Sequence, residues 1–203
     1  MSQWKELARQ AQERAVLLAA TEILQTKGFA FTTMEEVAEK AGISKATLYK
    51  LFPSKEELLE RVVEFHHHQV QEELEKIPPE NFRQSFPKLL DLFFSQLEKR
   101  YNFVKLMMIE AISNGPFLKS NRKRLHERII QNRNFYRKII GEFVAAGKRE
   151  GYIREPQEAI TGLILAVLKG VALELIFYEE EEFKRFTEFT RKKIMELVGL
   201  KEG

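Results

Sequence analysis

The chain contains no cysteine, so it can form no disulfide, no thiolate zinc site and no cysteine nucleophile. It also lacks a Walker loop, a dinucleotide-binding glycine pattern, an HExxH motif and a GxSxG motif. Its net charge of +3, from 33 lysines and arginines against 30 acids, is too small to indicate a polyanionic partner by itself. We therefore expect no enzyme activity, no cofactor and no metal, and we look for nucleic-acid binding in the distribution of charge.

Long apolar runs are equally scarce. The longest, residues 159–178, is interrupted by Lys169 and Glu174, and a charge at the centre of a bilayer costs about 2.5–3.5 kcal/mol. We interpret this run as a soluble helix that is covered on both sides. The first residues lack the apolar segment of a secretory signal. We therefore expect a cytoplasmic protein without membrane contact.

Helical periodicity dominates the chain, and no convincing alternation of a strand is present. An all-α fold of about nine helices is predicted, with stops at Gly28, Gly42, Pro53, Pro78-Pro79 and Pro156. With their caps, the predicted helices cover residues 4–27, 33–41, 44–52, 54–76, 80–99, 101–113, 119–149, 156–178 and 181–198.

Residues 33–55 carry the most informative pattern, which is two capped helices joined by a turn containing Gly42. Thr33 and Glu36 form a capping box, and Ser44 is placed to cap the next helix. Two short helices with such a turn form a helix-turn-helix, whose second helix enters the major groove of DNA.

The second helix of this pair is predicted to have two different faces. Leu48 and Phe52 are four residues apart and should point inward. They would pack against Ile23, Leu24, Val37 and Ala38. The outward face would then carry Ser44, Lys45, Thr47, Tyr49 and Lys50. Residues 1–57 contain eight basic and eight acidic residues, so their net charge is zero. Residues 43–55, however, contain three lysines and no acidic residue, so positive charge is concentrated there.

This segment resembles the DNA-binding signature of the TetR family of bacterial transcriptional regulators. The resemblance covers residues 12–60 and is carried by Phe31-Thr32-Thr33, Val37-Ala38, Ala41-Gly42-Ile43-Ser44-Lys45-Ala46-Thr47-Leu48-Tyr49-Lys50-Leu51-Phe52 and Pro53-Ser54-Lys55-Glu56-Glu57-Leu58. It implies a homodimer whose two recognition helices enter successive major grooves of a palindromic operator. It also implies a DNA-binding domain at 1–57, a linking helix to about 76, and an effector-binding and dimerisation domain at 58–203.

The resemblance also implies roles for individual residues. Thr33 and Lys55 match phosphate contacts, whereas Lys45, Thr47 and Tyr49 match contacts to bases or backbone. Many members have an aromatic residue or a histidine after the tyrosine that matches Tyr49. This chain has Lys50 there, and we expect it to make a charged contact. The predicted DNA-binding set is Thr33, Ser44, Lys45, Ala46, Thr47, Tyr49, Lys50 and Lys55.

The C-terminal region is rich in phenylalanine, since most of the 16 phenylalanines lie beyond residue 80. Members of the family often use such residues to line a cavity for a small effector. The simpler account of any single aromatic residue is that it fills a core. The predicted pocket residues are Phe86, Phe93, Gln96, Phe103, Met107, Glu110, Asn114 and Phe135.

Residues 159–177 are apolar nearly all round, so the helix there needs cover on both sides. Small residues at Gly162, Ala166 and Gly170 would allow two backbones to approach closely. With the last helix, this segment predicts a four-helix dimer interface; the alternative is the central helix of a monomeric bundle. The predicted interface residues are Leu163, Ala166, Val167, Gly170, Phe186 and Ile194.

Together these patterns predict a TetR-like repressor that binds operator DNA as a homodimer. A small apolar or aromatic effector would release it or modulate its binding. One alternative is a DNA-binding organiser without a ligand. The other is an all-helical interaction scaffold or enzyme that retains a helix-turn-helix.

Overall fold

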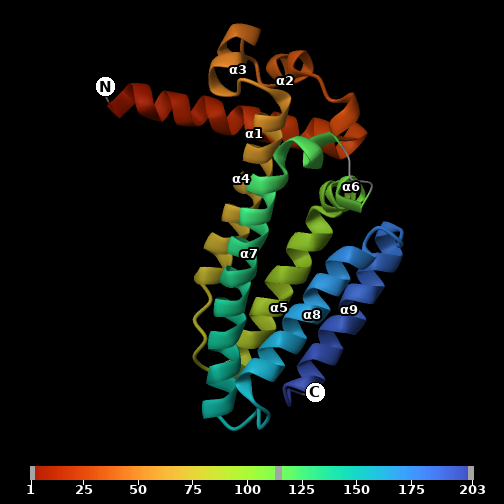
Figure 1. Cartoon of the computed structure of the whole chain (residues 1–203). Coiled ribbons are helices and arrows are strands. Elements are labelled where there is room, and N and C mark those ends of the chain that lie inside the picture. Colours follow the sequence, from red (N-terminus) through yellow and green to blue (C-terminus); the bar gives the residue numbers. More distant parts are fainter. Residues whose placement is uncertain (1–2, 113–115, 201–203) are drawn as a thin grey trace. The chain divides into compact units, whose positions relative to one another are not determined.

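The computed structural model describes residues 3–112 and 116–200, with side chains at all these positions except 111, 112, 116–126, 128 and 129. In these ranges the protein is all-helical and contains no strand, as predicted. Its helices (Figure 1) are α1 (Gln3–Phe31), α2 (Met34–Lys40), α3 (Lys45–Leu51), α4 (Lys55–Glu75), α5 (Phe82–Lys99), α6 (Tyr101–Ile112), α7 (Pro116–Arg149), α8 (Gln157–Glu174) and α9 (Glu180–Leu197).

The largest differences from the predicted helix ends are four residues, at the C-terminal ends of α1 and α8. Helix α1 continues past Gly28 to Phe31, with non-helical backbone angles at the glycine that kink it. Helix α8 stops at Glu174, four residues earlier than predicted. Beyond it, the carbonyl of Tyr178 accepts hydrogen bonds from the Tyr101 hydroxyl and from Lys105 Nζ, the latter at 2.9 Å. These contacts come from a distant helix, so local periodicity did not reveal them.

The chain divides into two compact units, which we call unit 1 and unit 2. Unit 1 comprises residues 1–69 and 110–121, and unit 2 comprises residues 70–109 and 122–203. Helices α4, α6 and α7 each contribute residues to both units.

Unit 1 contains the three N-terminal helices, in which α1 packs on α2 and α2 packs on α3 (Figure 1). Helix α1 has a buried inner stripe, since the exposed fractions of its members do not exceed 8%. These residues are Val16, Ala20, Ile23 and Leu24. At the start of α4, the Glu57 N–H donates to Ser54 Oγ at 3.1 Å, so Ser54 caps this helix.

Unit 2 is built around aromatic residues from α5, α7 and α9. The rings of Phe82 and Phe86 stack at 4.8 Å, and Phe143 lies 6.4 Å from Phe86. Helix α5 starts where the Phe82 N–H donates to both carboxylate oxygens of Glu150, at 2.9 and 3.0 Å. This carboxylate satisfies a backbone donor that the first turn of a helix otherwise leaves unpaired.

Candidate nucleic-acid interface

The first helix of the helix-turn-helix is held by the predicted capping box. The Glu36 N–H donates to Thr33 Oγ1 at 3.3 Å, and the Thr33 N–H donates back to Glu36 Oε2 at 3.1 Å. Lys27 also donates to this carboxylate. The hydrogen bond from Lys27, followed by those from the hydroxyl and N–H of Thr33, lowers the pKa of Glu36 to about 2. The start of α2 is therefore tied to α1 through a carboxylate that is ionised at neutral pH.

The turn between the two helices depends on Gly42, which has a φ of 68°. A residue with a side chain rarely adopts this left-handed conformation, whereas glycine adopts it freely. It allows the Ile43 N–H to donate to Ala38 O at 3.0 Å and directs the chain into α3. There Ser44 caps the helix, because its Oγ accepts the Thr47 N–H at 3.1 Å.

Helix α3 has the two faces predicted from its sequence. Leu48 is 0% exposed and Phe52, directly after the helix, is 1% exposed, so both are core residues. Tyr49, between them in the sequence, is 46% exposed. Also exposed are Ser44, Lys45, Ala46 and Lys50, whereas Thr47 is half-buried. An exposed face with a phenol, two lysines and a hydroxyl suits hydrogen bonding to phosphates and base edges.

The charge on this face is positive and weakly neutralised. The ammonium group of Lys45 lies 3.2 Å from a carboxylate oxygen of Glu35, and both side chains are exposed. Such pairs contribute about 0–1 kcal/mol, so a phosphate can compete for the lysine. The first turn of α3 contains no acidic residue, and the partial positive charge of its N-terminus adds to that of the lysines.

Lys55 occupies a more internal place than the other predicted DNA contacts. Its Nζ donates to the carbonyl oxygens of Phe29 at 2.8 Å, Thr32 at 3.0 Å and Ala30 at 3.4 Å. These three acceptors match the three donors of an ammonium group. A phosphate contact by Lys55, which stays a prediction, would require one of them to be exchanged.

The predicted effector residues are distributed over both units. Phe86 and Phe103 are core residues. Glu110 belongs to unit 1 and Asn114 lies outside the described residues. Half-buried positions are occupied by Phe93, Gln96, Met107, Glu110 and Phe135.

Two of these residues join an aromatic cluster in unit 2 that the sequence analysis did not assemble. Tyr136 packs edge-on against Phe93 at 6.2 Å and against Phe135 at 5.4 Å. Burial raises the pKa of Tyr136 and lowers the pKa of Arg100, and the two groups interact electrostatically. The cluster thus combines an apolar surface with a partly desolvated guanidinium group.

The predicted dimer residues divide into surface and core. On α8, Leu163, Ala166 and Gly170 are exposed and Val167 is half-buried. On α9, Phe186 is half-buried and stacks on Tyr178 at 5.1 Å, whereas Ile194 is a core residue of unit 2. Further exposed apolar residues on or just beyond these helices are Leu173, Phe177, Phe189 and Leu197.

Described residues of unit 2 line surface cavities. One, of about 490 Å³, is lined by Arg83, Pro87, Tyr152, Arg191, Met195, Gly199 and Leu200. Another, of about 410 Å³, lies between α7 and α8 and is lined by Asn134, Arg137, Lys138, Gly141, Glu142, Ala145, Gln157, Glu158 and Thr161. None of the predicted effector residues that the structure describes lines either cavity. The cavity residues were missed because each set is assembled from distant parts of the sequence.

Neither a metal site nor a membrane span emerges from the described residues. No group of three or more histidines, aspartates or glutamates among them is arranged to hold a metal ion. The histidine run at 66–68 does not converge: His66 turns inward, with Nε2 2.9 Å from Thr21 Oγ1, and His68 is exposed. In the same ranges, every helix is too short or too polar to traverse a bilayer.

Comparison with known proteins places this geometry in a family. Residues 16–62 match the family described as "Bacterial regulatory proteins, tetR family". The transcriptional regulator EthR of Mycolicibacterium smegmatis is 47% identical over 47 residues, which are 23% of this chain and 22% of EthR. The chain spans about a quarter of the length of the curated relatives it matches.

Solved structures extend the likeness to nearly the whole chain. A TetR transcription regulator from Haloarcula marismortui has a TM-score of 0.78 and 18% identity, covering 93% of this chain and 97% of that one. The regulator FadR from Bacillus subtilis, in complex with stearoyl-CoA, has a TM-score of 0.68 and 18% identity, covering 92% and 98%. At these identities the likeness establishes a shared fold. Residues 16–62 therefore match the DNA-binding domain of the TetR family, and the chain as a whole shares the fold of TetR-family transcriptional regulators.

Proposed function

We propose that this regulator is a cytoplasmic repressor that binds palindromic operator DNA as a homodimer. The observation that carries the proposal is the division of α3, in which Leu48 is buried while Lys45, Tyr49 and Lys50 are exposed. A purely structural helix has no need of two lysines and a phenol on its open face. In the major groove the same groups would meet phosphates and base edges.

The test is selection of binding sequences from random duplex DNA by the purified chain, followed by a footprint. A dimer of such helices is expected to enrich a palindrome with half-site centres about 34–36 Å apart, one turn of DNA. Tyr49→Ala should lose the footprint and Lys192→Ala, an exposed lysine on α9, should retain it. Enrichment of no sequence, or an unchanged footprint with Tyr49→Ala, would contradict the proposal.

The dimer is proposed to form through the exposed apolar faces of α8 and α9. Leu163 is 46% exposed and Phe177 is 73% exposed, and a side chain added at Gly162 or Gly170 would meet nothing within 4 Å. Apolar surface of this kind on neighbouring helices indicates an interaction site. Light scattering at micromolar concentration should give twice 23.8 kDa, and Leu163→Arg should give the monomer mass. A wild-type monomer would exclude this interface.

The effector is proposed to be a small apolar or aromatic compound. The cluster of Phe93, Phe135 and Tyr136 supports this, as does the capture of stearoyl-CoA by FadR, which has the same fold. Effector binding would favour a separation of the two recognition helices that differs from the groove repeat, and operator affinity would fall.

Coupling between effector and operator can be measured directly. Stearoyl-CoA and a panel of aromatic compounds would be titrated into the protein–operator complex, with fluorescence anisotropy of labelled DNA as readout. A binding compound should release the DNA, and Phe135→Ala should shift the titration to higher concentration. If a compound binds but operator affinity stays constant, the release mechanism is wrong even though DNA binding stands.

A further inference from the structure

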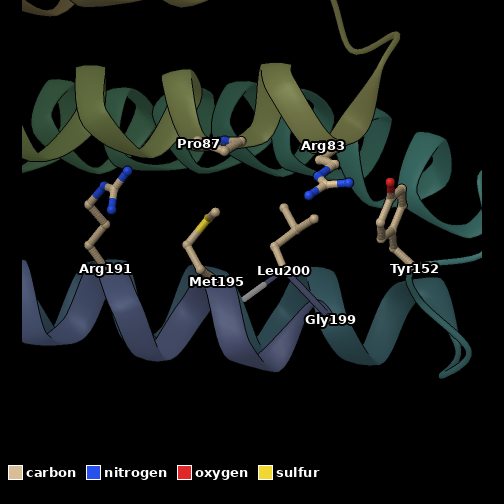
Figure 2. A pocket seen from close by; sticks show the side chains of 7 residues that line it. All are labelled: Arg83, Pro87, Tyr152, Arg191, Met195, Gly199 and Leu200. Atoms are coloured by element: carbon tan, nitrogen blue, oxygen red, sulfur yellow. The ribbon is translucent and has the colours of Figure 1, made fainter. Parts of the chain in front are cut away.

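The larger cavity of unit 2 is a groove between the start of α5 and the end of α9. Figure 2 shows Arg83 and Pro87 on α5 facing Arg191 and Met195 on α9, with Tyr152 and Leu200 at one end. Its volume of about 490 Å³ lies within the range of roughly 300–1,000 Å³ that is typical of small-molecule sites.

The floor of the groove depends on a tight turn at the end of α9. Gly199 has a φ of 76°, and a β-carbon placed there would lie 2.8 Å from the carbonyl oxygen of Tyr152. After this turn the Leu200 N–H donates to Met195 O at 2.9 Å. Leu200 is thereby directed back towards the core and is 4% exposed. The apolar floor is therefore a fixed part of the core of unit 2.

The charged lining of the groove has one sign, since its seven lining residues include two arginines and no acid. Arg191 pairs with Asp91 at the edge of α5. Arg83 is exposed and makes no hydrogen bond or ion pair with the part of the chain that the structure describes. The Tyr152 hydroxyl likewise makes no hydrogen bond there, although its ring packs on Phe82 at 5.7 Å.

The position of Arg83 is unfavourable for the fold. It is the second residue of α5, where the partial positive charge of the helix N-terminus repels a cation. The backbone donor of Phe82 is already satisfied by Glu150, so Arg83 takes no part in capping. Helix stability therefore gives no reason for an arginine here, whereas binding of an anion in the adjacent groove does.

We propose that the groove binds a small monocarboxylate with an apolar body. The carboxylate accepts hydrogen bonds from the Arg83 guanidinium and the Tyr152 hydroxyl. The apolar body lies on Pro87, Met195 and Leu200. The side chain of Arg191, paired with Asp91, closes the far end of the groove. This site is separate from the predicted effector residues, and it does not rest on the proposed function, because it requires neither DNA binding nor dimerisation.

The experiment is calorimetric titration of the full chain with octanoate, using 1-octanol and octylammonium as probes with the same apolar chain. Octanoate is expected to bind saturably with one site per chain, and the neutral and cationic probes to bind at least about tenfold more weakly. Arg83→Ala should weaken octanoate binding about tenfold or more, and Tyr152→Phe should weaken it several-fold.

Arg185→Ala serves as the matched control, because it removes an exposed arginine from α9 outside the groove. Its octanoate affinity should equal that of the wild type, and the melting temperature of Arg83→Ala should not fall below the wild-type value. The proposal is overturned if octanoate does not saturate, if 1-octanol binds as tightly, or if Arg83→Ala leaves the affinity unchanged. Equal losses in Arg83→Ala and Arg185→Ala would also overturn it, because they would reflect net charge alone.

Discussion

The ammonium group of Lys55 donates a hydrogen bond of 2.8 Å to the carbonyl oxygen of Phe29 and lies 4.3 Å from the centre of the Phe29 ring. One side chain at the start of α4 thus supplies a donor to the end of α1, where backbone carbonyls lack helical partners. The same contact places a cation over an aromatic face. This pair joins two ends of the helix-turn-helix domain that are 26 residues apart.

Replacement of Lys55 by alanine is expected to lower the free energy of unfolding by about 1–3 kcal/mol, because buried carbonyls lose a charged donor. Urea denaturation followed by circular dichroism measures this. Lys50→Ala, an exposed lysine on α3, should change stability by less than about 0.5 kcal/mol. If Lys55→Ala also reduces the salt dependence of DNA binding, Lys55 contacts phosphate as well. If the salt dependence is unchanged, the role of Lys55 is structural only.

Tyr49→Ala is expected to weaken operator binding by about 1–3 kcal/mol while leaving the melting temperature unchanged. The Tyr49 side chain is 46% exposed, so the phenol is available to DNA and contributes little to the core. Anisotropy of a labelled operator at fixed salt concentration measures the affinity. Tyr49→Phe separates the hydroxyl from the ring, and a loss of folding in Tyr49→Ala would show that the exposed placement is wrong.

Lys45→Ala is expected to reduce the slope of log K against log salt by about 1, since one fewer phosphate is neutralised. The exposed Glu35 partner is not expected to prevent this contact, because such a pair is weak. Binding would be measured between 50 and 200 mM salt, roughly the range over which such slopes are large. A slope equal to that of Lys192→Ala would mean that Lys45 does not reach the backbone.

Glu36→Gln tests the pH dependence of the α2 cap. The pKa of Glu36 is lowered to about 2 from its ordinary value of 4.5, so the folded state favours the carboxylate. Its contribution to stability is therefore complete above pH 4.5 and is lost as the pH falls towards 2. Wild type should be more stable than Glu36→Gln at pH 7, with the difference vanishing over this window, as thermal unfolding would show. Glu39→Gln, an exposed glutamate on the same helix, should show no such convergence.

The sequence predicted the helix-turn-helix well because the interactions that define it are short in range. The capping box joins Thr33 and Glu36, three residues apart, and the inward pair Leu48 and Phe52 follows from one turn of helix. The prediction for α8 ran too far because the segment after Glu174 remains apolar, whereas in the fold the Tyr178 carbonyl accepts hydrogen bonds from Tyr101 and Lys105. Composition likewise singled out the C-terminal phenylalanines, but it could not separate Phe86 in the core from Phe93 in the half-buried cluster.

The sequence by itself therefore determined the all-helical class, the helix-turn-helix and the side of α3 that faces outward, since each depends on periodicity and capping within a few residues. Only the tertiary structure decided that Lys55 is held by Phe29 and Thr32, and that Arg83 and Arg191 meet across one groove. Those relationships arise when helices distant in sequence pack together, and packing depends on the shapes of many side chains at once.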